Sequence, residues 1–363
     1  MKKKTSRKKV LMAVYNDIQL DGRVQRAARA LAYDFDLLLC SVNSSSDYTD
    51  VPCRNANFKL GRFAYIRFLF KLLFLFLKER PDILYIHDYN MVAFIPMVLP
   101  FLGKSKLVYD AHETIAVNKR SEVVKIVRYF ACIEKRYIKH VDLVITPIED
   151  RASFMRRFYG LKDIHIFKNI PIYSFTQLPE KKIEEKVKII YQGILNKNRK
   201  LDSLIFLAEE LGNQFQFDFV GYGTDEDRLK KMVSDRKLTN VKFLGKVSPQ
   251  NLHKYLLHAD IGLAFYPMDS INTRFCAPNK IYEYAQAGLI IVSSNQWLFR
   301  DTFKKYPFGV AVDIIHDPIS KLADEIREIA KIRGKSLKYS QAFLSENNAE
   351  KEMNALKDRI FEL

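Results

Sequence analysis

Short runs of consecutive apolar residues alternate with helical patterns along most of the chain. The runs are rich in Val, Ile, Leu and Phe, which is typical of strands buried on both faces of a parallel sheet. Between them, apolar residues recur at three- and four-residue spacing, as in helices that cover such a sheet. The alternation predicts an α/β protein. Strands are expected at 10–15, 36–42, 82–88, within 106–113, at 142–147 and 164–168, and then at 187–193, 215–220, 241–244, 260–266, 289–293 and 309–312.

The alternation is interrupted over residues 169–186, where two prolines and few periodic apolar positions indicate a linker. A chain of 363 residues is also too long for one ordinary core and fits two domains of roughly 150–200 residues. We therefore expect a first domain at 1–170 and a second at 171–338.

The net charge of +17 is concentrated in the first half. Residues 1–170 hold 30 Lys and Arg against 17 Asp and Glu, whereas residues 171–363 hold 29 against 25. This asymmetry suggests an anionic partner, either a lipid surface or nucleic acid, although a genomic preference for lysine would have the same effect. Nucleic acid ranks last, because no groove-reading or base-stacking motif accompanies the charge.

Residues 62–78 form the most apolar segment of the basic half. The segment is too short to span a bilayer, and Arg67 and Lys71 interrupt it. Two interpretations remain open: an amphipathic helix packed on the sheet, and a helix lying in the membrane interface with its cations directed to the lipid headgroups.

The four cysteines are widely scattered and form no C-x-x-C pair, and the first residues lack an apolar signal core. These features predict a protein of the reducing cytoplasm.

Polar residues gather where the strands of the first half end. In parallel sheets the carboxyl ends of strands are where ligands bind, so these positions are site candidates. Two neighbouring strand ends each supply a histidine and a carboxylate, which suits either a metal site or an acid/base cluster for a polyhydroxylated substrate. Histidines that merely complete hydrogen bonds at strand ends are the third interpretation. The candidates are Asp21, Arg23, His87, Asp88, His112 and Glu113.

Three features of the second half could hold a phosphate. Arg199 and Lys200 follow a strand at the beginning of a helix, and Gly221-Tyr222-Gly223 allows close backbone approach. Pro278 suits the first position of a helix that carries Asn279, Lys280 and Glu283 in its first turns. All three are expected at the same edge of one sheet.

The ordered motifs Y-Q-G…R-K-L, F-V-G-Y-G, A-D-I-G-L-A-F-Y and A-P-N-K-I-Y-E-Y-A-Q-A-G resemble the nucleotide-sugar half of family-four glycosyltransferases. In the first half D-G-R-V, I-H-D, V-Y-D-A-H-E and K-N-I-P agree with that family. The resemblance covers nearly the whole chain, and the P-N-K-x-x-E segment resembles a variant subgroup. It implies the GT-B fold, with two Rossmann-like domains facing across a cleft and a closing helix at 339–363 that crosses back to the first domain.

The resemblance also implies a reaction, the transfer of a sugar from a nucleotide diphosphate with retention and without a metal or other cofactor. Arg199 would be the main diphosphate contact, with Lys200 and Lys280 as secondary ones, and Glu283 would bind the ribose or the donor sugar. Tyr222 and the flanking Gly221 and Gly223 would line the path of the base and phosphates. Pro278 and Asn279 belong to the same donor motif. His112 would face the reacting centre, with Asp21, Arg23, His87, Asp88 and Glu113 on the acceptor side.

The chain departs from the family pattern at two positions. Phe275 stands where the first glutamate of the family's Glu-x7-Glu motif is expected, and Ile194 stands where many relatives have arginine. The first departure leaves Asn272, Arg274 and Asn279 as substitutes for contacting the sugar hydroxyls. Because of the second, Arg199 would have to neutralise more of the negative charge of the diphosphate.

These features together predict a cytoplasmic glycosyltransferase, peripheral on the inner face of a bacterial plasma membrane, that acts on a lipid-linked saccharide in surface polysaccharide synthesis. The donor base, UDP or GDP, stays open. Alternatives are a nucleotide-sugar epimerase of the same fold, a metal-dependent hydrolase that uses the two histidines, and a non-catalytic transferase-like scaffold protein.

Overall fold

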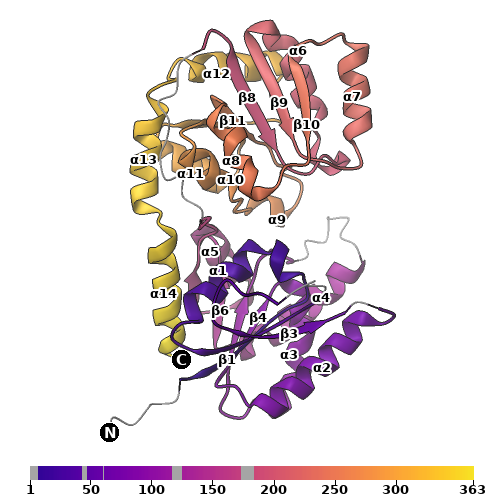
Figure 1. Ribbon diagram of the computed structural model, residues 1–363, viewed down its shortest axis with the longest axis vertical. Helices are drawn as coiled ribbons and strands as arrows, with labels where there is room; N and C mark the ends of the chain where they lie inside the picture. Colours follow the sequence, from indigo (N-terminus) through magenta and orange to yellow (C-terminus); the bar gives the residue numbers. More distant parts are fainter. Residues whose placement is uncertain (1–6, 43–46, 60, 117–124, 173–183) are drawn as a thin grey trace. The chain divides into compact units, whose positions relative to one another are not determined.

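A computed structural model of the chain describes residues 7–42, 47–59, 61–116, 125–172 and 184–363. The chain forms two compact units, Met1–Ile172 with Ala349–Leu363, and Tyr173–Asn348. Each unit has one parallel sheet covered by helices, which confirms the predicted α/β class (Figure 1). The units divide two residues beyond the 170/171 boundary expected from the sequence. Residues 173–183 of the predicted linker and the basic residues 1–6 lie outside the described residues.

The first sheet has seven parallel strands in the order β3-β2-β1-β4-β5-β6-β7. The order reverses between β1 and β4, so the loops after these strands leave in opposite directions, and ligands of such sheets bind at this switch point. The strands are β1 (Lys9–Val14), β2 (Asp36–Val42), β3 (Arg54–Phe58), β4 (Ile83–His87), β5 (Lys106–Asp110), β6 (Leu143–Thr146) and β7 (Ile164–Ile166).

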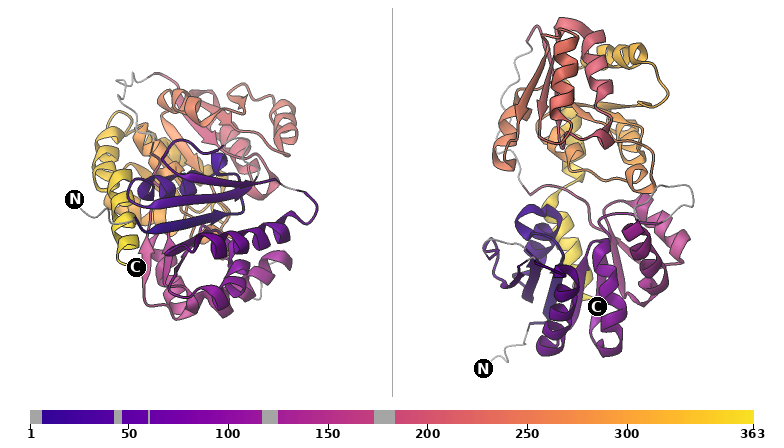
Figure 2. Two further views of the ribbon diagram at one scale, coloured as in Figure 1. Left: turned by 60° about the horizontal axis from the view of Figure 1, so that its bottom comes forward. Right: turned by 90° about the vertical axis from the view of Figure 1, so that its right-hand side faces the viewer.

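Helices cover both faces of this sheet (Figure 2). Asp21 caps the first of them, because its carboxylate accepts hydrogen bonds from the amides of Arg23 and Val24, both at 3.2 Å. The helices are α1 (Gly22–Leu31), α2 (Ala64–Glu79), α3 (Ile95–Val98), α4 (Lys125–Tyr137) and α5 (Glu149–Tyr159), with 3-10 turns η1 (Ile18–Leu20), η2 (Tyr89–Phe94), η3 (Leu99–Phe101) and η4 (Ile138–His140).

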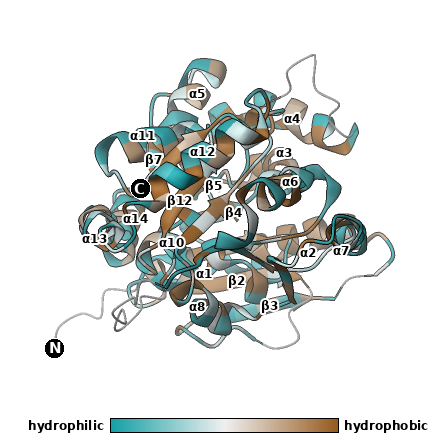
Figure 3. Ribbon diagram, turned by 90° about the horizontal axis from the view of Figure 1, so that it is seen from above, coloured by the Kyte–Doolittle hydropathy of each residue, from teal (hydrophilic) through white to brown (hydrophobic). Residues whose placement is uncertain are grey.

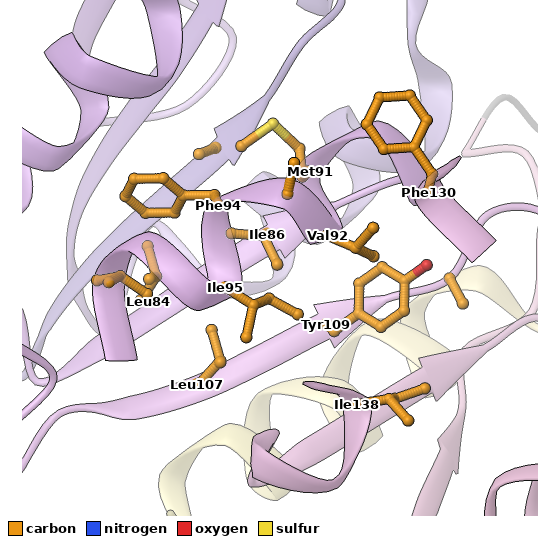
Figure 4. Close-up of a cluster of buried hydrophobic side chains, with 14 of the residues drawn as sticks. Leu84, Ile86, Met91, Val92, Phe94, Ile95, Leu107, Tyr109, Phe130 and Ile138 are labelled. Atoms are coloured by element: carbon orange, nitrogen blue, oxygen red, sulfur yellow. The ribbon is translucent and has the colours of Figure 1, made fainter. Parts of the chain in front are cut away.

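Alternate residues of the strands enter two separate cores. On one face Leu84, Ile86 and Leu107 pack against α2, η2 and α4, as Figure 4 shows for part of this cluster. On the other face Val10 and Met12 pack against α1 and the C-terminal helix. Because both faces are covered, the inner strands are mainly apolar, as the brown parts of β4 and β5 show in Figure 3.

The segment 339–363 does not form one closing helix. α13 (Ser336–Glu346) belongs to the second unit, and α14 (Ala349–Phe361) belongs to the first. α14 lies beside α1, where Phe361 stacks at 4.4 Å from Phe35 and Glu352 pairs with Lys168 at 3.3 Å. The crossing back to the first domain is therefore confirmed for residues 349–363.

The second sheet has six parallel strands in the order β10-β9-β8-β11-β12-β13, with its switch point between β8 and β11. The strands are β8 (Val187–Gln192), β9 (Phe215–Val220), β10 (Val241–Gly245), β11 (Ile261–Ala264), β12 (Ile290–Ser294) and β13 (Gly309–Val312). The helices are α6 (Asp202–Leu211), α7 (Glu226–Asp235), α8 (Pro249–Leu257), α9 (Ile271–Arg274), α10 (Lys280–Gln286), α11 (Trp297–Lys305) and α12 (Ile319–Ala330), with 3-10 turns η5 (Lys197–Arg199) and η6 (Gly212–Gln214).

Two details differ from the sequence-based prediction. β3 was not predicted, because Arg54–Phe58 is a partly exposed edge strand with alternating polar residues and no apolar run. The helix expected to start at Pro278 starts at Lys280, with Asn279 as its N-cap residue. This helix has only seven residues, so its N-terminus offers a weaker anion site than the sequence suggested.

Candidate active site

A group of cations lies at the carboxyl edge of the second sheet. Arg199 ends the turn η5 after β8, and Tyr266 follows β11 across the switch point. The Arg199 guanidinium lies 5.0 Å from the centre of the Tyr266 ring, and the Lys280 ammonium lies 4.9 Å from the same ring. Lys280 is also 4.7 Å from the ring of Tyr191. Aromatic faces attract cations, so the two rings hold both side chains at the strand ends.

Lys280 has an unusual protonation equilibrium. Burial and the neighbouring Arg199 together lower the pKa of Lys280 to about 7, against the opposite effect of Glu283. A bound polyanion would favour the charged form. The chemistry of the pair therefore suits an anionic ligand such as a diphosphate.

Glu283 lies one turn after Lys280 on α10 and accepts a hydrogen bond from the Gln192 amide at the end of β8. The glutamate is partly exposed, so its carboxylate can also accept from a ligand hydroxyl. The structure thus brings together Arg199, Lys280 and Glu283, as expected from the sequence, and adds Gln192, Tyr191 and Tyr266. All three added residues lie at or near strand ends. Aromatic and amide side chains are common at such positions, so the sequence alone could not identify these three as site residues.

The two glycines of Gly221-Tyr222-Gly223 have a structural role that the sequence did not indicate. A Cβ atom on Gly221 would lie 1.8 Å from the Gly193 carbonyl oxygen, and one on Gly223 would lie 2.0 Å from that of Leu195. The glycines are therefore needed where the loops after β8 and β9 cross. Tyr222 between them is 52% exposed and lies beneath the Lys246 ammonium at 4.8 Å.

The other residues predicted on the donor side lie in the segments that follow β8 and β11. Lys200 is exposed and lines a separate surface pocket with Ser203, Phe206 and Arg228. Arg274 donates from Nε to the Met268 carbonyl at 3.1 Å. Asn272 is partly buried on α9, and Pro278 and Asn279 form the partly buried connection to α10.

Phe275 is buried and packs edge-on against Trp297, with ring centres 4.9 Å apart. Its side chain therefore belongs to the packing beneath α9 and α11. The replacement of a glutamate by phenylalanine at this position is accommodated by an aromatic partner.

A second polar group lies at the carboxyl ends of β4 and β5 in the first sheet. His87 ends β4 and pairs in register with Asp110, which ends β5. His87 Nδ1 lies 3.1 Å from His112 Nε2 and 3.5 Å from Asp110 Oδ2. Arg23 binds Asp110 through Nη2 at 2.7 Å and Nε at 2.9 Å. The strand register thus joins His87, His112 and Arg23 through a residue that was not predicted.

Burial and neighbouring charges shift the pKa values of Asp110, His112 and Asp21 in this group. Although burial raises the pKa of Asp110, the Arg23 guanidinium and the two histidines hold it well below its usual range. Burial lowers the pKa of His112 to about 3 despite the opposite effect of Asp110 and Asp21, so this ring is neutral at physiological pH. Burial raises the pKa of Asp21 but His112, the Val24 amide and other groups lower it overall.

Asp88 differs from the other carboxylates. Its backbone has φ 73° and ψ 158°, a conformation that residues other than glycine rarely adopt. Burial, with nearby Glu113 and Asp21, raises the pKa of Asp88 to about 7 against the lowering effect of the Tyr89 amide. Strained residues with shifted pKa values cluster at functional sites, which supports Asp88 as a site residue. Glu113 itself is exposed.

His87, Asp110 and His112 lie close enough to one another to hold a metal ion, since one ligand atom from each lies within 4.8 Å of the others. The Asp110 carboxylate, however, is already neutralised by the two-pronged contact with Arg23. A divalent ion would have to compete with that fixed cation, so the residues fit a hydrogen-bonded cluster better than a metal site.

Of the site residues that were not predicted, Asp110 has a signal in the sequence that could have revealed it. Asp110 ends its strand at the position that pairs with His87, so aligning the two strands by their apolar runs would have revealed it. Arg151 is different. It is buried on α5 and donates from Nη1 to the carbonyl oxygens of His112 at 2.6 Å and Ala111 at 3.3 Å, which no local pattern indicates.

Among the residues that the structure describes, no helix combines the length and the apolar character needed to cross a bilayer.

Two family models match the chain. Residues 23–170 match Glycosyltransferase Family 4, and residues 175–344 match Glycosyl transferases group 1. "Uncharacterized glycosyltransferase MJ1069" of Methanocaldococcus jannaschii is 30% identical over 171 residues. That match spans 44% of this chain and 43% of the relative.

Solved proteins share the fold over nearly the whole chain. Anabaena Alr3699/HepE, solved in complex with UDP and glucose, has a TM-score of 0.73 at 14% identity and covers 98% of this chain and 100% of its own. WaaG, a glycosyltransferase involved in lipopolysaccharide biosynthesis, has a TM-score of 0.72 at 14% identity, with 97% and 99% covered. Residues 23–170 and residues 175–344 thus each match a glycosyltransferase family, and the fold over nearly the whole chain is the GT-B fold.

Proposed function

We propose that this protein transfers a sugar from a nucleotide diphosphate to a lipid-linked saccharide acceptor, with retention at the anomeric carbon. The observation that carries the donor part is the pairing of Arg199 and Lys280 over Tyr266 at the switch point of the second sheet. The related Alr3699/HepE was solved with UDP and with UDP-glucose, which supports a nucleotide-sugar donor.

The chemistry of glycosyl transfer explains why this site needs two cations. A departing diphosphate gains negative charge while the sugar passes through an oxocarbenium-like state. Arg199 can bind two phosphate oxygens at once, and Lys280 adds a second positive charge when it is protonated. Side chains thus supply the charge stabilisation that a divalent ion provides in other transferases, and we include metal independence in the proposal.

The remaining roles follow from what each side chain can bind. Glu283, steadied by Gln192, accepts from hydroxyls of the ribose or the donor sugar. In the first unit His112, Asp21 and Asp88 form a polar strand-end group for acceptor hydroxyls.

The lipid part of the proposal rests on the surface of α2. One face of this helix is buried through Phe68, Leu69, Leu72 and Phe76, which confirms the amphipathic packing on the sheet. The opposite face carries a row of exposed apolar side chains at helical spacing, which we call the α2 stripe. It consists of Phe63, Ile66, Phe70, Phe74 and Leu77, exposed by 66, 54, 62, 69 and 44%.

Exposed cations flank the α2 stripe. Arg67, Lys71 and Lys78 lie on the same helix, and Arg62 precedes it. Aromatic residues flanked by lysine and arginine suit an interface with anionic headgroups, where each basic residue adds about 1 kcal/mol of attraction. We therefore assign the protein to the inner face of a bacterial plasma membrane, in surface polysaccharide synthesis. WaaG, a neighbour in fold, is involved in lipopolysaccharide biosynthesis, which supports this assignment.

The test is a transfer assay with labelled nucleotide sugars and lipid extracts of bacterial membranes. Label is expected in the lipid fraction, with unchanged yield in excess EDTA, and NMR of the product should show the anomeric configuration of the donor. Arg199→Ala and Glu283→Ala should each lower the rate by roughly a hundredfold. Wild-type rates in both variants would refute the site assignment.

The same assay separates the alternatives. An epimerase would convert the donor sugar with no acceptor present, which NMR of the donor alone detects. A metal-dependent hydrolase would lose its activity in EDTA. A scaffold protein would bind nucleotide sugar without turnover, as the replacement of the motif glutamate by Phe275 would allow.

A further inference from the structure

The contact between His87 and His112 restricts where their protons can be. Two ring nitrogens lie 3.1 Å apart, and a hydrogen bond between them needs one proton. Because burial keeps His112 neutral, its ring carries a single proton, on either Nδ1 or Nε2. With His112 neutral, either His87 donates from Nδ1 or His112 donates from Nε2.

In the first arrangement His87 donates from Nδ1, and His112 accepts at Nε2 and carries its own proton on Nδ1. In the second, His112 donates from Nε2, and His87 must carry its proton on Nε2. That His87 atom is buried and has no hydrogen-bond partner among the described residues. Each arrangement leaves this buried atom unpaired, as an N–H group in the second and as a lone pair in the first, so the surrounding charges decide between them.

The surrounding charges favour the first arrangement. The ionised Asp110 carboxylate lies 3.5 Å from His87 Nδ1 and 3.9 Å from His112 Nε2, so it is nearer to the donor atom of the first arrangement than to that of the second. The Asp21 carboxylate lies 4.0 Å from His112 Nδ1, which is an N–H group in the first arrangement and a lone pair in the second. A carboxylate attracts the N–H group and repels the lone pair.

We infer that His87 and Asp110 are positioning residues that hold His112 as its Nδ1–H tautomer, so that Nδ1–H and the Asp21 carboxylate form a donor–acceptor pair for one substrate hydroxyl. The 4.0 Å between His112 Nδ1 and Asp21 Oδ2 is too long for a direct hydrogen bond. A hydroxyl oxygen between them can accept from the ring and donate to the carboxylate.

Exposure agrees with this division of roles. The side chains of His112 and Asp21 are 14% and 12% exposed, so a ligand can reach them, whereas those of His87 and Asp110 are fully buried. Arg23 completes the arrangement by keeping Asp110 ionised. It follows that His112 binds and orients a hydroxyl and does not remove a proton through Nε2, since His87 occupies that atom. The catalytic meaning of this role rests on the proposed function.

The direct test is long-range ¹H–¹⁵N spectroscopy of the full chain labelled at its seven histidines, with His112 assigned by its absence in His112→Gln. The expected spectrum shows His112 protonated at Nδ1 and unprotonated at Nε2 throughout pH 5–8. The titratable and charged groups that face the His112 ring are Asp21, Asp110, Arg23 and His87. Protonation at Nε2, or a charged ring within that range, would overturn the inference.

Two variants of His87 test the positioning role. His87→Asn places an amide N–H near the position of Nδ1, whereas His87→Leu has similar bulk and no donor. In His87→Leu, the His112 proton should distribute over both nitrogens and the transfer rate should fall roughly tenfold. His87→Asn should restore the Nδ1–H tautomer and part of the rate. An unchanged His112 tautomer in His87→Leu would contradict the inference.

The two proposals can fail separately. The tautomer of His112 is read without any substrate, so an Nδ1–H ring in a protein that transfers no sugar would leave the inference standing and refute the function. If His87→Leu does not fold, the wild-type spectrum alone decides.

Discussion

Lys280 couples donor binding to pH at the scale of a single residue. Burial lowers its pKa to about 7, so near neutral pH about half of the molecules have an uncharged Lys280. A diphosphate binds the charged form better, which means that binding takes up a proton. We expect the affinity for a nucleotide sugar to be highest below pH 7 and to fall as pH rises through 7, by up to about tenfold per unit.

Calorimetry in buffers of different ionisation enthalpy measures this proton uptake. A nucleotide sugar is the suitable ligand, because its pyrophosphate diester does not titrate near neutrality. In Lys280→Arg the pH dependence should disappear, since arginine stays charged. Proton uptake that persists in Lys280→Arg would assign the effect to another group.

Lys200 is held in a backbone conformation that costs stability. Its φ is 50°, in the left-handed region that lysine rarely adopts, and its side chain is exposed. Lys200→Gly should therefore raise the free energy of unfolding by about 1 kcal/mol, and urea denaturation measures it. Lys200→Ala retains the Cβ atom and should give no gain. Equal stability of the two variants would show that the backbone is not strained there.

Helix α4 is attached to the first sheet through a buried carboxyl group. Glu134 accepts hydrogen bonds from Tyr109 on β5, at 2.7 Å, and from Tyr159 on α5. Burial raises the pKa of Glu134 to about 7, against the lowering effect of both tyrosines and Arg151. The fold thus favours the protonated form, so this stabilising effect is complete below the ordinary pKa of 4.5 and is lost as pH rises through 7.

Glu134→Gln removes that titration. Relative to the variant, the wild-type protein should lose roughly 1–3 kcal/mol of stability between pH 4.5 and pH 8. Urea unfolding of both proteins across this range measures the difference. Parallel stability curves would mean that Glu134 does not titrate in this range.

The α2 stripe makes a prediction about a whole element. Phe70→Glu with Phe74→Glu should lower binding to anionic vesicles at low salt at least tenfold, because two aromatic rings are replaced by like-charged groups at an anionic surface. Ile315→Glu is the matched control, a 45% exposed apolar residue of the second unit. Equal sedimentation of all three proteins with vesicles would refute the membrane assignment.

At the scale of the whole molecule, most of the fold could be predicted from the sequence. Apolar runs mark the central strands because helices cover both faces of each sheet. The edge strand β3 escaped prediction because Arg54–Phe58 is only half buried and needs no apolar run. The break between α13 and α14 escaped too, since the helical pattern continues on both sides of Asn347 and Asn348.

The candidate site was less predictable than the fold. Arg199, Lys280 and Glu283 lie in motifs with a recognisable order, so resemblance was enough to find them. Asp110 and Gln192 act through partners that lie 87 and 91 positions away in the sequence, on elements joined only by sheet topology. The crossing of the loops at Gly221 and Gly223 likewise depends on the neighbouring strand. Contacts of this kind become visible only when strand order and register are known.

The central claim is that the carboxyl edge of the second sheet binds a nucleoside diphosphate, and calorimetric titration with UDP and GDP tests it most directly. One of the two should bind the wild-type protein. Arg199→Ala should weaken that binding roughly ten- to a hundredfold, and Lys200→Ala, one position further and in a separate pocket, should weaken it much less. Failure of both nucleotides to bind, or equal losses in the two variants, would contradict the claim.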